Sequence, residues 1–172
     1  MSTKPVLASW ILALAVAGSL LVALRPGHAQ TSPADRAIAE RLVHSDPFLA
    51  LAPGADLVVV ASPTSRRSYW SADHRLILTD YRLAIAGALR GSPPAAIGLT
   101  VEGGEVGEVG LAVSAAPRFE PGARYALLLE REGAGFRVRS GVLGERRLAT
   151  GVLATDPDLQ ALDFVLKSGV LR

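Results

Sequence analysis

The glycine-rich segment at residues 101–110, VEGGEVGEVG, has the spacing that comes nearest to a chemical motif. Its four glycines are Gly103, Gly104, Gly107 and Gly110. A phosphate-binding loop needs a lysine and a hydroxyl after its last glycine, followed by a helix. Here residues 111–114 read LAVS, which is a strand pattern, and three glutamates in the segment would repel a phosphate. We therefore predict no nucleotide site and expect a structural turn, either a hairpin or a bulge that lets a sheet bend.

Two groupings of histidine with aspartate contain residue types that bind metal ions. They are His44 with Asp46, and Asp73 with His74. Neither has the helical His-x-x-x-His arrangement or another tight ligand spacing. Solvated surface groups explain both more simply, so we predict no metal site and no cofactor.

Nucleophilic catalysis finds little support in the sequence. The chain has no cysteine, and no serine stands in the Gly-x-Ser-x-Gly motif of many hydrolases. Asp56, Asp80 and Glu130 are candidates for a pair of catalytic carboxyls. Strand-end and solvent-facing positions account for each of them, so we predict no catalytic residue, and an enzyme of unassigned chemistry is kept as an alternative.

Aromatic and basic side chains suggest a surface for a protein or another envelope component. The residues assigned to this interaction surface are Tyr69, Trp70, His74, Arg137 and Arg139. Tyr69 and Trp70 are expected in a polar connection, where an exposed aromatic ring can anchor a partner; the alternative is that Trp70 covers one end of a barrel. The arginines, with Arg131, Arg146 and Arg147 nearby, form either a basic patch or a solvent face balanced by Glu130, Glu132 and Glu145.

The first thirty residues read as an export signal. Lys4 precedes an uncharged, mostly apolar run at residues 6–24, and Ala29–Gln30 fits a cleavage site. We expect a signal peptide at residues 1–29 and an exported protein, periplasmic or secreted; the alternative is an uncleaved anchor in the inner membrane. The chain has 18 basic and 16 acidic side chains, and residues 1–29 contain Lys4, Arg25 and no acid. The remaining chain is formally neutral, which argues against nucleic acid as a partner.

The remaining pattern predicts a mainly β fold between helices. Residues 30–54 should hold a short helix, which begins at Ser32-Pro33, and a linker. Residues 55–150 should form a small antiparallel OB-like barrel of five to seven strands, and residues 151–172 a C-terminal helix. The strands are expected at residues 57–62, 76–91, 97–101, 109–114, 124–131, 136–140 and around 147–149. The second of these alternates apolar and polar residues over its length, and a bend is expected at Gly87.

Several short motifs occur in the order found in a family of exported bacterial proteins of unassigned chemistry. They are Leu89-Arg90-Gly91, Gly103-Gly104, Ser114-Ala115-Ala116-Pro117-Arg118-Phe119, Gly122 and Leu127-Leu128-Leu129. From about residue 55 to residue 145 the chain resembles this family. Its layout is similar to the OB-like barrel of netrin-type domains and of tissue inhibitors of metalloproteinases. The resemblance implies a fold and no catalytic residue. The inhibitors reach their enzyme's zinc through an N-terminal cysteine, so their mechanism does not transfer to this chain.

These observations together predict an exported, non-enzymatic β-barrel module that binds a protein or an envelope component. A regulator or accessory of a secreted metalloprotease is a second interpretation, which rests on the resemblance alone. Specificity is expected in the loops at one end of the barrel, where Tyr69, Trp70 and the glycine-rich segment should lie.

Overall fold

The computed structural model describes residues 31–170 and is mainly β, with 40% strand and 29% helix. The mainly β prediction is therefore confirmed. The predicted signal peptide, its apolar run and the expected cleavage between Ala29 and Gln30 lie outside the described residues. Within residues 31–170, no helix combines the length and the apolar character that crossing a bilayer requires.

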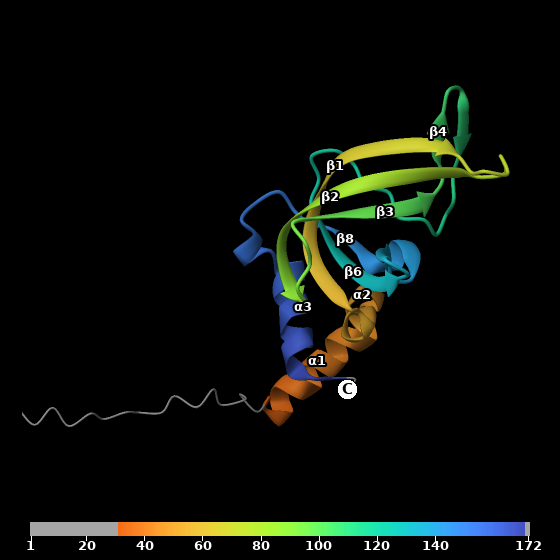
Figure 1. Cartoon of the computed structure of the whole chain (residues 1–172). Coiled ribbons are helices and arrows are strands. Elements are labelled where there is room, and N and C mark those ends of the chain that lie inside the picture. Colours follow the sequence, from red (N-terminus) through yellow and green to blue (C-terminus); the bar gives the residue numbers. More distant parts are fainter. Residues whose placement is uncertain (1–30, 171–172) are drawn as a thin grey trace, which may run out of the picture. The chain divides into compact units, whose positions relative to one another are not determined.

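Three α-helices lie at the two ends of the described chain (Figure 1). They are α1 (Pro33–Ser45), α2 (Pro47–Leu51) and α3 (Pro157–Ser168). Each begins with a proline after a capping side chain, from Ser32, Asp46 and Asp156 respectively. Such a cap satisfies backbone N–H groups that the first helical turn leaves unpaired. The helix start expected at Ser32-Pro33 is present, and the expected C-terminal helix begins at Pro157.

A sheet of six antiparallel strands forms the centre of the fold, in the order β3-β2-β1-β6-β7 with β8 also paired to β6. Its strands are β1 (Leu57–Trp70), β2 (Ile77–Arg90), β3 (Ala96–Glu102), β6 (Tyr125–Glu132), β7 (Gly135–Val138) and β8 (Glu145–Arg147). The separate hairpin is β4 (Gly104–Val106) with β5 (Val109–Leu111). Short 3-10 turns are η1 (Ala52–Gly54), η2 (Gly141–Gly144) and η3 (Leu153–Thr155).

The sheet curls but does not close into a barrel. β3 and β7, at its two ends, come near each other, yet no ladder of hydrogen bonds joins them. The predicted barrel is therefore confirmed only in part, because the strands form an antiparallel, curled sheet that does not close. Gly87, where a bend was expected, lies beside two register shifts between β1 and β2, and such irregularities increase the local twist of a sheet.

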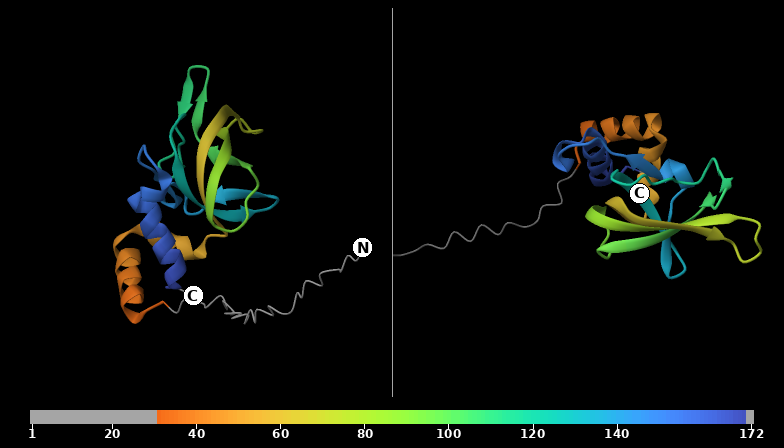
Figure 2. Two further views of the ribbon diagram at one scale, coloured as in Figure 1. Left: turned by 90° about the vertical axis from the view of Figure 1, so that its left-hand side faces the viewer. Right: turned by 90° about the horizontal axis from the view of Figure 1, so that it is seen from above.

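Both faces of β1 are buried at its start, because two separate cores flank the sheet. Val58 and Val60 face the helices, in a core that also contains Leu128 of β6. Leu57 and Val59 face the interior of the curl. Figure 2 shows the helices gathered on one side of the sheet. The uninterrupted apolar run of β1 follows from this arrangement, since a strand covered on both sides has no face for polar residues.

The second half of β1 corrects a sequence prediction. Residues 63–75 were expected to be a polar connection, but β1 continues to Trp70 and the turn to β2 is confined to residues 71–76. Beyond Ala61 the strand has left the double-sided core and pairs only with β2. A strand with one free edge tolerates Pro63 and polar side chains, so its sequence resembles that of a loop.

Arg146 of β8 ties the helical layer to the sheet. Its Nη2 lies 2.7 and 2.9 Å from the two carboxylate oxygens of Asp46, and its Nη1 lies 2.9 Å from Oδ1 of Asp158. Its guanidinium also stacks over the ring of Phe48, 4.8 Å from the ring centre. Burial favours a raised pKa for Asp46, but the hydrogen bonds and charge of Arg146 outweigh it and lower that pKa. One side chain thus joins β8 to the first turns of α2 and α3.

We predict that Arg146→Ala lowers the free energy of unfolding by about 2 kcal/mol, because it strands two partly buried carboxylates. Urea unfolding followed by circular dichroism measures the change. The neighbouring Arg147→Ala is the control: Arg147 forms an exposed pair with Glu120, and its loss should cost under about 1 kcal/mol. Equal effects of the two substitutions would contradict the conclusion that Arg146 joins β8 to α2 and α3.

Candidate functional site

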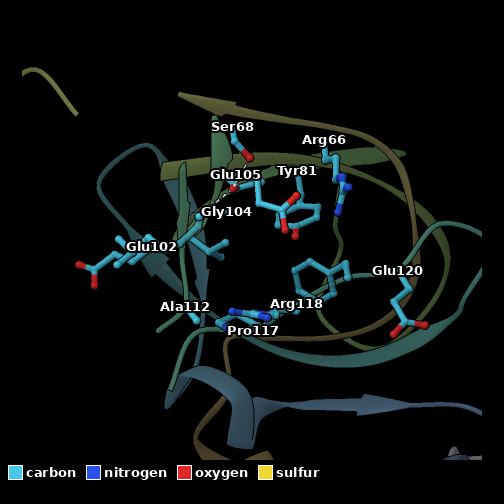
Figure 3. A pocket seen from close by; sticks show the side chains of 16 residues that line it. Arg66, Ser68, Tyr81, Glu102, Gly104, Glu105, Ala112, Pro117, Arg118 and Glu120 are labelled. Atoms are coloured by element: carbon cyan, nitrogen blue, oxygen red, sulfur yellow. Dashed lines mark hydrogen bonds between the residues drawn. The ribbon is translucent and has the colours of Figure 1, made fainter. Parts of the chain in front are cut away.

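A pocket of about 630 Å³ occupies the open mouth of the curled sheet. The second half of β1, together with β2 and β3, forms one wall, and the segment at residues 117–120 forms the opposite wall. The hairpin β4–β5 borders the pocket (Figure 3). The pocket residues labelled in Figure 3 come from strands and from the connection before β6, so distant parts of the sequence build one cavity.

Two glycines set the position of the hairpin over the sheet. Gly103 and Gly104 have φ of 99° and 133°, in the range that other residues rarely adopt. A Cβ on Gly104 would overlap the hydroxyl oxygens of Thr79 and Ser68. Thr79 donates to the carbonyl oxygen of Gly103 at 2.6 Å and shares a hydrogen bond of 2.8 Å with Ser68. The glycine-rich segment is thus a tight corner, held by hydroxyls, that leads into the hairpin β4–β5.

Aromatic rings form the floor of the pocket. Phe119 lies edge to face between Tyr81 and Tyr125, with ring centres 5.0 and 5.2 Å apart. The hydroxyl of Tyr125 accepts a hydrogen bond of 2.9 Å from the backbone N–H of Glu120. This contact holds the segment that carries Phe119 against Tyr125.

The charged groups around the floor are unevenly paired. Arg66 and Arg118 line the pocket and, within the described residues, neither forms an ion pair. Of the acids, Glu120 pairs with Arg147 at 2.6 Å, and Glu102 points away from the cavity in Figure 3. Glu105 extends into the cavity near Ser68. The pocket therefore presents two guanidinium groups beside an apolar floor, with one carboxylate at the hairpin end.

A second pocket of about 410 Å³ shares Ala112 and Arg118 with the first. Glu145 of β8 lines it, and the buried Oε2 of this carboxyl has no hydrogen-bond partner in residues 31–170. Burial raises the pKa of Glu145 to about 7, against the opposing effect of a hydrogen bond from the backbone of Arg118. A carboxyl with that pKa is partly protonated at neutral pH and can both donate and accept.

The aromatic residues predicted to bind a partner lie away from the pocket floor. Tyr69 and Trp70 are half-buried at the end of β1, and the exposed His74 lies in the following turn. The hydroxyl of Tyr69 donates to Asp80 at 3.2 Å, and the rings of Trp70 and His74 are 6.4 Å apart. These three residues share the tip of the β1–β2 hairpin.

The predicted arginines lie on β7 and just after it, apart from that tip, and they are neutralised. Arg137 binds Glu130 at 2.8 Å, and Arg139 binds the other oxygen of the same carboxylate at 3.0 Å. Arg139 also donates to the carbonyl oxygen of Gly54 at 3.1 Å. Arg146 forms the ion pairs with Asp46 and Asp158 described above. This geometry favours the balanced solvent face over the basic patch.

The candidate metal ligands and catalytic acids have other partners. Asp46 caps α2 and binds Arg146, whereas Asp73 accepts from Ser71 at 2.6 Å. Asp56 accepts from the backbone N–H of Arg131 at 2.7 Å, and Asp80 accepts from Thr100 at 2.7 Å. Over residues 31–170, no group of three or more histidine, aspartate or glutamate side chains is arranged to hold a metal ion.

The sequence analysis expected specificity near the glycine-rich segment, which does line the pocket, but it assigned no role to Arg66, Arg118 or Phe119. Arg66 stood in a presumed loop, and nothing in its neighbourhood marked it. Arg118 and Phe119 did carry a signal, because they belong to the motif Ser114-Ala115-Ala116-Pro117-Arg118-Phe119 on which the family resemblance rests. Glu145 was considered only as a balancing surface charge. Its burial depends on loops remote in sequence, so no local pattern reveals it.

Comparisons with models of protein families, with curated proteins and with solved structures gave no match to this chain.

We predict that Gly104→Ala destabilises the fold by about 2–4 kcal/mol, since the new methyl group meets two hydroxyls in a strained backbone conformation. The matched control is Gly110→Ala in the same hairpin, where a Cβ would lie an ordinary 3.6 Å from the side chain of Glu105; its cost should stay within about 1 kcal/mol. Thermal unfolding of both variants measures the difference. A Gly104→Ala variant as stable as the parent would show that the corner is not required.

We also predict that Glu145 makes the protein less stable as pH rises. Its pKa lies at about 7 in the folded state against 4.5 for the free group. The contribution of Glu145 to the free energy of unfolding is thus fully present below pH 4.5 and is lost as pH rises through about 7. The isosteric Glu145→Gln stays neutral and should be more stable than the parent at about pH 8, by about 2 kcal/mol after allowance for solvent access. Thermal melts from about pH 5 to about pH 8 test this, with the exposed Glu108→Gln as the control that should follow the parent.

Proposed function

We propose that the protein is an exported binding module of OB-like architecture whose ligand, a segment of a protein or an envelope component, enters the pocket at the mouth of the sheet. The strand arrangement supports the OB-like assignment. A long, bent first strand pairs with both the second strand and β6, and the two end strands approach each other. Such an arrangement agrees with the partly open barrel of OB-folds, the architecture that the proposed resemblance to netrin-type domains implies.

The observation that carries the proposal is the pocket itself. An aromatic floor around Phe119 lies beside Arg66 and Arg118, two guanidinium groups without ion-pair partners in the described chain. Preformed concave sites with convergent polar groups are typical of ligand pockets, and this one exposes polar as well as apolar surface. Arginine and aromatic side chains are also the residues most often found to dominate binding energy.

The hydrogen bonds that the pocket hydroxyls already form favour binding over catalysis. Ser68 and Thr79 hydrogen-bond to each other, and Thr79 donates onward to the carbonyl oxygen of Gly103. A nucleophilic hydroxyl would instead donate to a general base. These two side chains serve the glycine corner, and they leave recognition as the role for the rest of the pocket.

We predict that Arg118→Ala reduces recovery of the natural partner several-fold, because the substitution removes one of the two unpaired charges, while the melting temperature stays within a few degrees of the parent's. A tagged full chain would be used for affinity capture from the envelope and culture fluid of the producing cell, with mass spectrometry of bait and captured proteins. The exposed Arg36→Ala on α1 is the control.

Trp70→Ala in the same assay separates the pocket from the hairpin tip. If recovery falls with Trp70→Ala and is unchanged with Arg118→Ala, the partner binds at the tip of the β1–β2 hairpin, and the pocket proposal is wrong. The mass of the captured bait also shows whether the chain is cleaved after Ala29.

A further inference from the structure

We infer that the ligand is an extended acidic peptide that joins the sheet as an additional strand along the free edge of β1 at residues 62–67. This inference rests on the proposed function and names the class of partner. Addition of a strand gives affinity through backbone hydrogen bonds and specificity through side chains on alternate sides. Three features support strand addition: the unpaired edge, its position beside the pocket, and its charge.

The edge is left unpaired because β1 is longer than its neighbour on that side. β6 pairs with β1 only from Leu57 to Ala61. From Ser62 onward β1 pairs with β2 alone, and no other strand of the described chain joins its opposite edge. The hairpin β4–β5 limits this edge at Ser68, where Gly104 packs against the serine side chain. A stretch of about six residues is thus open to an incoming strand.

The register shows which backbone groups are available. The N–H of Ser71 donates to the carbonyl of Leu76 next to the hairpin turn. In an antiparallel ladder, hydrogen-bonded and non-hydrogen-bonded pairs alternate. Counting back along the continuous register, Ser65 and Arg67 direct their N–H and C=O groups toward β2. The N–H and C=O of Arg66 therefore point outward, to the free edge.

The same edge borders the pocket. The side chains of Arg66 and Ser68 face the cavity, together with Tyr81 of β2. An added strand beside Arg66 would therefore run along the mouth of the pocket, with Arg118 and Phe119 on the opposite wall. Alternate side chains of that strand would enter the cavity, and the others would lie on the outer face of the sheet.

The charge of both faces selects acidic side chains. Arg66 and Arg118 face the cavity, while Arg67 and Arg82 are exposed on the other side of the β1–β2 ribbon. None of these four arginines forms an ion pair with another described residue. Because Glu105 occupies the hairpin end of the cavity, the inward acidic side chain should lie between Arg66 and Arg118.

A second copy of this chain is a poorer occupant of the edge. Antiparallel pairing of two β1 edges would bring arginines of one copy against those of the other, and like charges on facing strands are destabilising. In the alternative, Pro63 and the arginines only prevent the edge of β1 from pairing with another strand. The experiment below distinguishes these outcomes.

The probe is a ten-residue peptide of alternating glutamate and threonine with blocked ends, and its control replaces each glutamate with lysine. The protein is used as purified from its producing cell. Fluorescence anisotropy should give at least about tenfold tighter binding for the acidic peptide, with a strong decrease on adding salt. Amide hydrogen exchange should slow about tenfold at Arg66. The amides of Ser65 and Arg67, already bonded to β2, should change less than about twofold.

Two substitutions of Arg66 separate the contribution of its backbone N–H to peptide binding from that of its charge. Arg66→Ala removes the guanidinium and keeps the outward N–H, whereas Arg66→Pro removes both without breaking a hydrogen bond to β2. Arg66→Pro should weaken the acidic peptide at least about fivefold more than Arg66→Ala does, which corresponds to one lost backbone hydrogen bond. Melting curves of both variants verify that the fold is retained.

Strand addition is wrong if neither peptide binds, if the acidic peptide binds without protecting the amide of Arg66, or if the two variants bind it equally. It is also wrong if size-exclusion chromatography gives a dimer whose Arg66 amide is protected without peptide. These results leave the proposed function intact when Arg118→Ala still reduces capture of the natural partner. Loss of that Arg118 effect would contradict the proposed function itself.

Discussion

Burial of β1 and β6 on both faces is the constraint on which the rest of the structure depends. From Leu57 to Ala61, alternate side chains enter the core inside the curl and the core beneath the helices. Tyr125–Leu129 of β6 does the same one strand away. Neither core is large, so each needs the other to hold these strands in place. The helices are therefore part of the fold, and Arg146 adds a polar link between the layers.

The pocket lies where that constraint ends. Past Ala61 the first strand loses both the helical layer and its pairing with β6. The sheet opens there, and its interior is accessible through the pocket above Phe119. A corner of two glycines brings the β4–β5 hairpin across one side of the opening, while hydroxyls of Ser68 and Thr79 hold the corner. The buried packing of β1 is thus concentrated at one end of the strand, and the pocket opens at the other.

Sequence patterns predicted the parts of the fold that local chemistry determines. The capped helix at Pro33–Ser45 and the period-two strand at Ile77–Arg90 have strong local signals, and both are present. The end of β1 was missed because its polarity reflects exposure and not a turn. The site was missed for a related reason. Arg66, Arg118 and Glu145 become neighbours of cavities only through tertiary packing, and a single arginine or glutamate in a sequence gives no sign of its partners.

The loop-like composition of residues 62–67 and their unpaired backbone edge have one physical origin in this protein. A strand that is covered on both faces has no position for an arginine, and one that is paired along both edges cannot accept a new neighbour. Once β1 leaves the cores, both restrictions are lifted together. Residues 62–67 can then carry Pro63, Arg66 and Arg67, and the outward backbone of Arg66 has no partner strand in the described chain. A polar stretch that continues a strongly apolar strand is therefore a place to look for recognition, because its polarity marks where the strand stops serving the fold.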